Sequence, residues 1–191
     1  MNSTERLVEA YYRAKGHFTI TDIKVENGNN RQFDILTFDN KSKTHYHVEV
    51  SVTHALNWTK PVSWITERMG YKFFGQTTNK RPDNNKTDFA KGKSYLQPIK
   101  HTYEKFGIDF NEVVRVWCTW ALGKEERSKL EEWREEMSLK YNIDKSKFDI
   151  LLFRDNVLSD LLRNIETANY DDELLRTLSL VQQHKKQTQG L

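Results

Sequence analysis

The hydrophobic and polar pattern of two neighbouring runs, Arg31 to Phe38 (RQFDILTF) and His45 to Val52 (HYHVEVSV), is typical of strands, and the second run alternates strictly. A period of two is typical of strands that turn one face toward a core. Only a short polar stretch separates the two runs, which predicts an antiparallel hairpin. A third strand, from about Phe18 to Val25, precedes an Asn27-Gly28 pair typical of tight turns, so we expect a three-stranded meander.

Helical periodicity dominates most of the remaining chain, as in the spacing of Leu130, Trp133 and Met137. It predicts helices from Ser3 or Thr4 to Lys15, Pro61 to Phe74, Ser94 to Phe106, Lys124 to Tyr141, Asn156 to Ile165 and Asp172 to Gln183. Two further strands are expected, at Val113 to Leu122 and Phe148 to Phe153, and the first is apolar enough to be buried on both faces. This order predicts an α/β fold with a mixed central sheet flanked by helices.

The length of 191 residues suits one domain, and 37% hydrophobic with 30% charged residues is a globular composition. We expect one domain over 1–183, a mobile basic loop at 76–93 and a flexible tail over 184–191. The chain has no long apolar run and no signal-like N-terminus, so we expect a cytoplasmic protein with no membrane partner. The one cysteine, Cys118, excludes an internal disulfide and is expected to be an inert core residue.

The net charge of +3 is too small by itself to indicate a nucleic-acid-binding protein. Basic residues nevertheless gather between Lys60 and Lys105, and Trp58 and Trp64 lie in or near that segment. Its central loop could bind a phosphate backbone or could simply be a solvated loop. The candidate nucleic-acid-binding residues are Lys80, Arg81, Lys86, Lys91 and Lys93.

Two acidic residues stand where strands normally carry hydrophobic side chains. Asp34 lies between Phe33 and Ile35, and Glu49 lies between two valines in the next strand. The hairpin would bring both carboxylates together, and half-buried carboxylates are costly unless a positive charge lies between them. A hard divalent cation such as Mg²⁺ fits this requirement. Structural alternatives are that Asp34 caps a turn or pairs with Arg31.

With its predicted fold, this pattern resembles the PD-(D/E)XK nuclease superfamily, which has the restriction-endonuclease-like fold. Glu9 matches the glutamate of the family's opening helix, Asp34 its aspartate, and Glu49-Val50-Ser51 its last motif. The resemblance covers about Ser3 to Leu122. It departs from the family at Ser51, where lysine is usual.

The resemblance implies a Mg²⁺-dependent nuclease, with Mn²⁺ able to substitute, that acts on nucleic acid, DNA in preference to RNA. Asp34, Glu49 and the Val50 carbonyl would hold the metal, and Glu9 would support the site or bind a second ion. The missing amine is expected from Lys72 or Lys100, with Lys72 favoured because its helix follows next in the sequence. The resemblance further implies a homodimer.

Three alternatives remain open from the sequence. The chain could be a nucleic-acid-binding protein that lost hydrolysis, with Ser51 as the sign of that loss, or a partner-binding scaffold with structural acids. His45 and His47 share a strand face with Glu49 and could form a zinc site, although ordinary surface histidines are commoner. His54 could shuttle protons.

Overall fold

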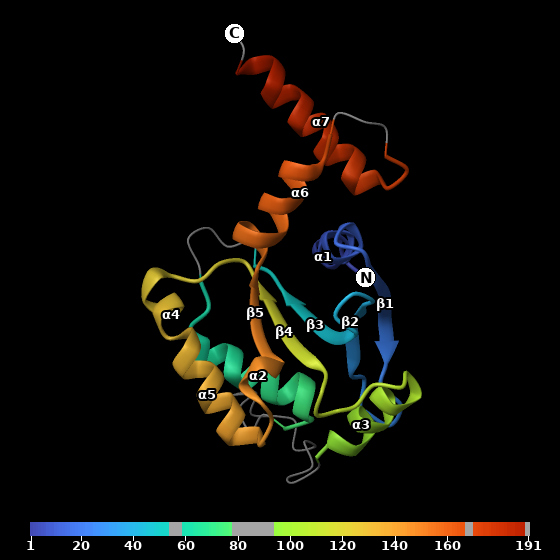
Figure 1. Ribbon diagram of the computed structural model, residues 1–191, viewed down its shortest axis with the longest axis vertical. Coiled ribbons are helices and arrows are strands. Elements are labelled where there is room, and N and C mark those ends of the chain that lie inside the picture. The colour runs from blue at the N-terminus through green and yellow to red at the C-terminus, as the bar shows by residue number, and fades with distance from the viewer. Residues whose placement is uncertain (54–58, 78–93, 167–169, 190–191) are drawn as a thin grey trace, which may run out of the picture.

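A five-stranded mixed sheet forms the centre of the computed structural model, which describes residues 1–53, 59–77, 94–166 and 170–189 (Figure 1). Its strands lie in sequence order: β1 (His17–Lys24), β2 (Gln32–Asp39), β3 (Thr44–Ser51), β4 (Val114–Thr119) and β5 (Phe148–Leu152). The first three strands pair antiparallel, and β4 and β5 add in parallel. The predicted meander and the α/β class with a mixed sheet are therefore confirmed.

Helices cover both faces of this sheet. On one face, α1 (Ser3–Ala14) packs beside η2 (Phe153–Leu158), a π-helix, and α6 (Ser159–Asn164). On the other face lie α2 (Val62–Phe74), α3 (Leu96–Lys105) and α5 (Leu130–Tyr141). Strand β4 contributes to both sides, because Val116 and Cys118 face α1 whereas Trp117 faces α2. The predicted burial of this strand on both faces is confirmed, and burial raises the pKa of the Cys118 thiol.

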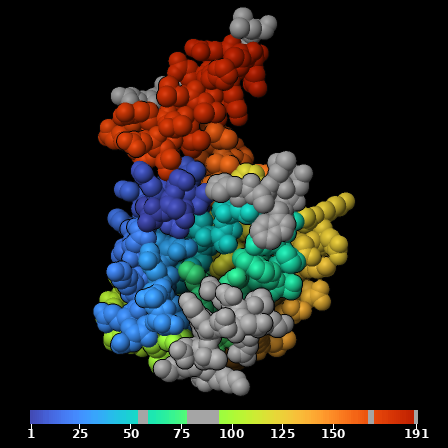
Figure 2. Space-filling view, turned by 180° about the vertical axis from the view of Figure 1, so that it is seen from behind, coloured from blue at the N-terminus to red at the C-terminus, as the bar shows by residue number. Residues whose placement is uncertain are grey.

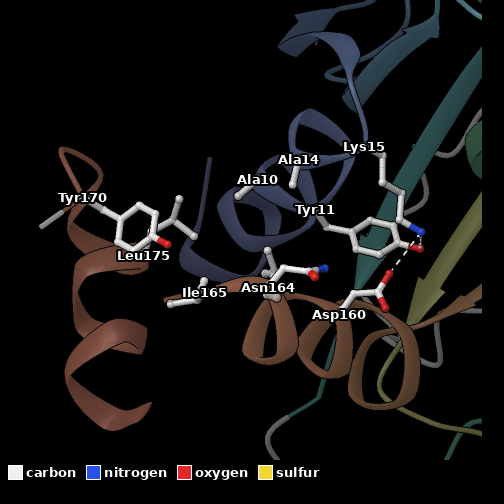
Figure 3. A pocket seen from close by; sticks show the side chains of 10 residues that line it. Ala10, Tyr11, Ala14, Lys15, Asp160, Asn164, Ile165, Tyr170 and Leu175 are labelled. Carbon is white, nitrogen blue, oxygen red and sulfur yellow. Dashed lines mark hydrogen bonds and ion pairs between the residues drawn. The ribbon is translucent and has the colours of Figure 1, made fainter. Parts of the chain in front are cut away.

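The C-terminal helices project beyond the sheet, with α7 (Glu173–Thr188) reaching furthest from it (Figure 1). Figure 2 shows α1 directly next to these helices. A cavity of about 140 Å³ lies between α1 and the helices α6 and α7, and Figure 3 shows the side chains around it. At its edge, Nζ of Lys15 donates to the hydroxyl of Tyr11 at 2.7 Å and pairs with Asp160 at 3.1 Å. The N-terminal helix thus anchors the C-terminal segment.

Several predicted helix boundaries are wrong. Asn2, and not Ser3 or Thr4, caps α1, because its side chain accepts hydrogen bonds from the N–H groups of Thr4 and Glu5. The predicted helix from Lys124 to Tyr141 is divided into α4 (Lys124–Ser128) and α5. At the division, the N–H of Lys129 bonds three residues back to Glu126, which tightens and ends the first helix.

The last helices also differ from expectation. The predicted helix from Asn156 begins earlier, as the π-helix η2 at Phe153. Helix α7 continues to Thr188 instead of ending at Gln183, because no glycine or proline interrupts it before Gly190. Most of the predicted loop at 76–93 lies outside the described residues. No helix in the described ranges has both the length and the apolarity needed to cross a bilayer.

Two glycines with left-handed backbone conformations offer a test of the packing around α2. Gly75 ends α2 with φ +64°, and Gly107 follows α3 with φ +67°. A Cβ at Gly75 would lie 2.3 Å from the carbonyl carbon of Tyr95, whereas a Cβ at Gly107 would meet nothing within 4 Å.

We expect Gly107→Ala to lower the free energy of unfolding by about 1 kcal/mol through backbone strain alone. Gly75→Ala should lower it by roughly twice as much or more, because steric overlap adds to the strain. Urea unfolding of both variants measures the difference. An equal or smaller loss for Gly75→Ala would contradict the tight junction between α2 and α3.

Candidate active site

Strands β2 and β3 separate at Asp34, and this separation creates the site. Their antiparallel pairing ends at Ile35 and Val48. Beyond that pair, the backbone N–H of Val50 donates to Oδ2 of Asp34 at 2.8 Å. Its acceptor is therefore a side chain of β2 and not the backbone of that strand. Since the N–H and C=O of one strand residue point to the same side, the Val50 carbonyl also lies on the side of Asp34.

Strand β2 is twisted at the same point. Phe33 and Leu36 belong to one core cluster beneath α3, although residues an odd number apart in a regular strand face opposite sides. Ile35 packs on the other face, with α1. In β1, Asp22 stands across from Asp34 with φ +57°, a conformation that interrupts regular pairing. Asp34 therefore lies at a local distortion of the sheet.

Glu49 is almost completely enclosed, with 1% of its surface exposed. Its Oε1 is 2.8 Å from Nε2 of His47, and its Oε2 forms an ion pair with Nζ of Lys72. Burial raises the pKa of Glu49, while the Lys72 ammonium opposes that effect. Both oxygens of the carboxylate therefore have fixed neighbours.

His47 connects Glu49 to α3. Its Nδ1 lies 2.5 Å from the hydroxyl of Tyr103, and burial holds the pKa of His47 well below its usual range. The ring is therefore neutral, and the network is satisfied when Tyr103 donates to Nδ1 and the Nε2–H donates to Glu49. Because both nitrogens are hydrogen-bonded to protein groups, neither is available for the zinc alternative.

Lys72 comes from α2 and lies between the two carboxylates. Its Nζ contacts Glu49, is 3.9 Å from Oδ1 of Asp34, and donates to the carbonyl of Gln32 at 3.4 Å. Burial alone would lower the pKa of Lys72, but the two carboxylates outweigh burial and raise it. With 28% of its side chain exposed, the charged amine lies at the border between the site and solvent.

Asp34 has a raised pKa. Burial, followed by the nearby charge of Glu49, raises the pKa of Asp34 to about 6, against opposing effects of Lys72 and the Val50 N–H. Two carboxylates with one ammonium leave an excess of negative charge, which an added cation would relieve.

The remaining sequence candidates are placed elsewhere. Glu9 accepts a hydrogen bond from Thr19 at 2.9 Å and lies 3.7 Å from Arg13. Lys100 lies over the ring of Phe110, at 4.8 Å, and makes no ion pair in the described part of the chain. Ser51 ends β3, beside Thr119. The basic residues Lys80, Arg81, Lys86, Lys91 and Lys93, together with His54 and Trp58, lie outside the described residues.

Arg31 does not pair with Asp34 among the described residues, contrary to the structural alternative. Its guanidinium donates to the carbonyl of Gly28 at 2.9 Å and lies over the rings of Tyr71 and Tyr95, at 4.3 and 4.1 Å. Tyr103 had no signal in the sequence, because it lies in a separate helix 56 residues after its partner His47.

The donor set suits a hard cation. Asp34, Glu49 and the Val50 carbonyl could offer oxygen ligands to such an ion, and the Lys72 ammonium already places positive charge between the carboxylates. The described residues contain no group of three or more acidic, histidine or cysteine side chains placed to hold a metal. Mg²⁺ does not require one, because it is commonly bound through one or two carboxylates and retains several waters.

The raised pKa of Asp34 predicts how the free energy of unfolding depends on pH. Folding disfavours the ionised form of Asp34. The resulting loss of folding free energy is absent below pH 3.8 and complete above about pH 6. We expect Asp34→Asn to raise the free energy of unfolding by roughly 1–3 kcal/mol at pH 8. This gain should shrink as the pH falls from 6 to 4.

Asp39, in the same strand, is the matched control, because hydrogen bonds from Ser42 and Lys41 lower its pKa. Asp39→Asn should therefore reduce stability at pH 8. Denaturant unfolding at pH 4, 6 and 8 measures both effects, and a destabilised Asp34→Asn protein at pH 8 would contradict the assigned charge state.

Comparison of the chain with protein-family models, curated proteins and solved structures finds no match in any of the three.

Proposed function

We propose that this protein is a Mg²⁺-dependent nuclease of the PD-(D/E)XK type, with a restriction-endonuclease-like fold, that hydrolyses phosphodiester bonds in DNA. The observation that carries the proposal is the meeting of Asp34, Glu49 and Lys72, from β2, β3 and α2, at the point where the strands separate. Two carboxylates and an amine are the groups that metal-assisted phosphodiester hydrolysis uses.

The position of Lys72 supports an active site despite the missing motif lysine. Ser51 stands where the resemblance expects that lysine. Taken alone, this difference favours the alternative of a protein that lost hydrolysis. In this fold an amine reaches Glu49 from α2 instead. The proposal therefore assigns to Lys72 the role of the motif lysine.

Each of the three side chains has a distinct part in the proposed reaction. Asp34 and Glu49 would hold Mg²⁺ with the Val50 carbonyl, and the bound ion would polarise the phosphate and lower the pKa of a water. Lys72 would stabilise negative charge on the phosphate once the ion replaces it as the partner of Glu49. The neutral His47, fixed by Tyr103, keeps Glu49 oriented.

The reaction also requires Asp34 to be ionised. Because the pKa of Asp34 is about 6 in the metal-free protein, activity at limiting Mg²⁺ should fall as the pH drops below that value. The preference for DNA and a homodimeric assembly follow from the resemblance and belong to the same proposal.

Cleavage assays test the function directly. With supercoiled plasmid or a labelled single strand and Mg²⁺ or Mn²⁺, we expect Asp34→Asn, Glu49→Gln and Lys72→Met each to lose roughly 100-fold or more in rate. Lys100→Met is the matched control and should retain activity, because Lys100 lies on Phe110 and away from the carboxylates.

The outcomes separate the alternatives. A Lys72→Met enzyme as active as wild type, with its fold intact, would contradict the role given to Lys72. Binding of nucleic acid without any cleavage would favour the protein that lost hydrolysis. Absence of cleavage, nucleic-acid binding and Mg²⁺ affinity together would favour the partner-binding scaffold.

A further inference from the structure

A line of cationic and aromatic residues leads along α2 to the candidate active site. Lys60, Trp64, Arg68 and Lys72 recur every four residues, and the last three belong to the helix. Residues four apart lie on neighbouring turns of the same helix face, about 6 Å apart along the axis. The line therefore ends at the amine that contacts Glu49.

Trp64 holds Lys60 and Arg68 in place. Nζ of Lys60 lies 3.9 Å from the centre of its ring, and the guanidinium carbon of Arg68 lies 5.1 Å from it. Trp64 itself packs edge to face against Trp117, which is the neighbour of Glu49 in the ladder between β3 and β4. The aromatic pair thus connects these cations to the site.

The charges along this line have one sign. Lys60 and Arg68 lie over the same Trp64 ring, and burial together with the charge of Arg68 lowers the pKa of Lys60. Arg68 is exposed and forms no ion pair with any described residue. Figure 2 shows part of α2 at the molecular surface.

Three acidic residues of the neighbouring helices lie on a different flank of α2 from this line, whereas the exposed Glu67 of α2 directly precedes Arg68 in the sequence. Val62 and Thr66 line a cavity of about 370 Å³ together with three glutamates and one lysine, namely Glu126, Glu132, Glu136 and Lys129. The Glu126 carboxylate accepts a hydrogen bond from the Val62 N–H at 2.6 Å. Helix α2 therefore has an acidic flank toward α5 and a separate basic line that leads to Lys72.

We propose that Lys60, Trp64 and Arg68 bind the sugar-phosphate backbone of a nucleic-acid strand and lead it to Lys72. A row of cations at regular intervals suits a polymer with regularly repeated negative charges better than a single phosphate, which needs converging donors. Trp64 contributes by holding the cations in position. The inference rests on the proposed function and names the surface by which that site takes its substrate.

Binding can be measured without cleavage. Fluorescence anisotropy with a labelled single-stranded oligonucleotide, in EDTA and at salt concentrations from 50 to 200 mM, gives both the affinity and its salt dependence. We expect Arg68→Gln to weaken binding several-fold at low salt and to reduce the salt slope by about one. Arg68→Lys should preserve the slope.

Lys41→Gln is the control for charge alone. Lys41 is exposed in the turn between β2 and β3, at the other end of these strands from Asp34, so its loss should leave affinity and slope unchanged. Equal binding by wild type, Arg68→Gln and Lys41→Gln would overturn the proposed path. Displacement of the oligonucleotide by an acidic peptide at equal concentration would also overturn it, in favour of a protein partner.

The two proposals can fail separately. If Asp34→Asn abolishes cleavage while Arg68→Gln binds and cleaves like wild type, the nuclease stands and the path along α2 is wrong. If wild type neither binds nor cleaves nucleic acid, both proposals fall.

Discussion

The charge of Lys72 is the constraint on which the site depends. An ionised carboxylate removed from water is costly, and Glu49 is both ionisable and almost fully enclosed beside Asp34. The ammonium of Lys72 offsets part of that cost and needs α2 to be held against the sheet. Ile65, Met69 and Phe73 provide this anchoring, because all three are fully buried in the core of that face.

The same face of the sheet supplies a second support for Glu49. Tyr103 fixes His47 from α3, and His47 fixes one oxygen of Glu49. Two helices from different parts of the sequence therefore act on one carboxylate, with a neutral hydrogen-bonded chain on one oxygen and a positive charge on the other. In the proposed function, the Lys72 side is therefore where a cation would replace the ammonium as the partner of Glu49.

Local sequence patterns were sufficient for the elements and for the central pair of acids. Strand-like patterns and apolar runs predict the strands, and Asp34 and Glu49 are conspicuous in the sequence because their neighbours are hydrophobic. Lys72 was favoured on sequence distance alone. The hydrogen bond between His47 and Tyr103 could not be predicted, because it depends on how α3 packs against β3. The division of the charged helix at Lys129 likewise depends on backbone bonding that hydrophobic periodicity does not reveal.

A crystal soaked in Mn²⁺ and measured for anomalous scattering tests the central claim most directly. We expect an anomalous peak between Asp34 and Glu49, within coordination distance of their carboxylate oxygens, with the Lys72 amine moved away from Glu49. A fully soaked crystal with no peak there, in which Lys72 still contacts Glu49, would contradict the assignment of these residues to a metal-dependent active site.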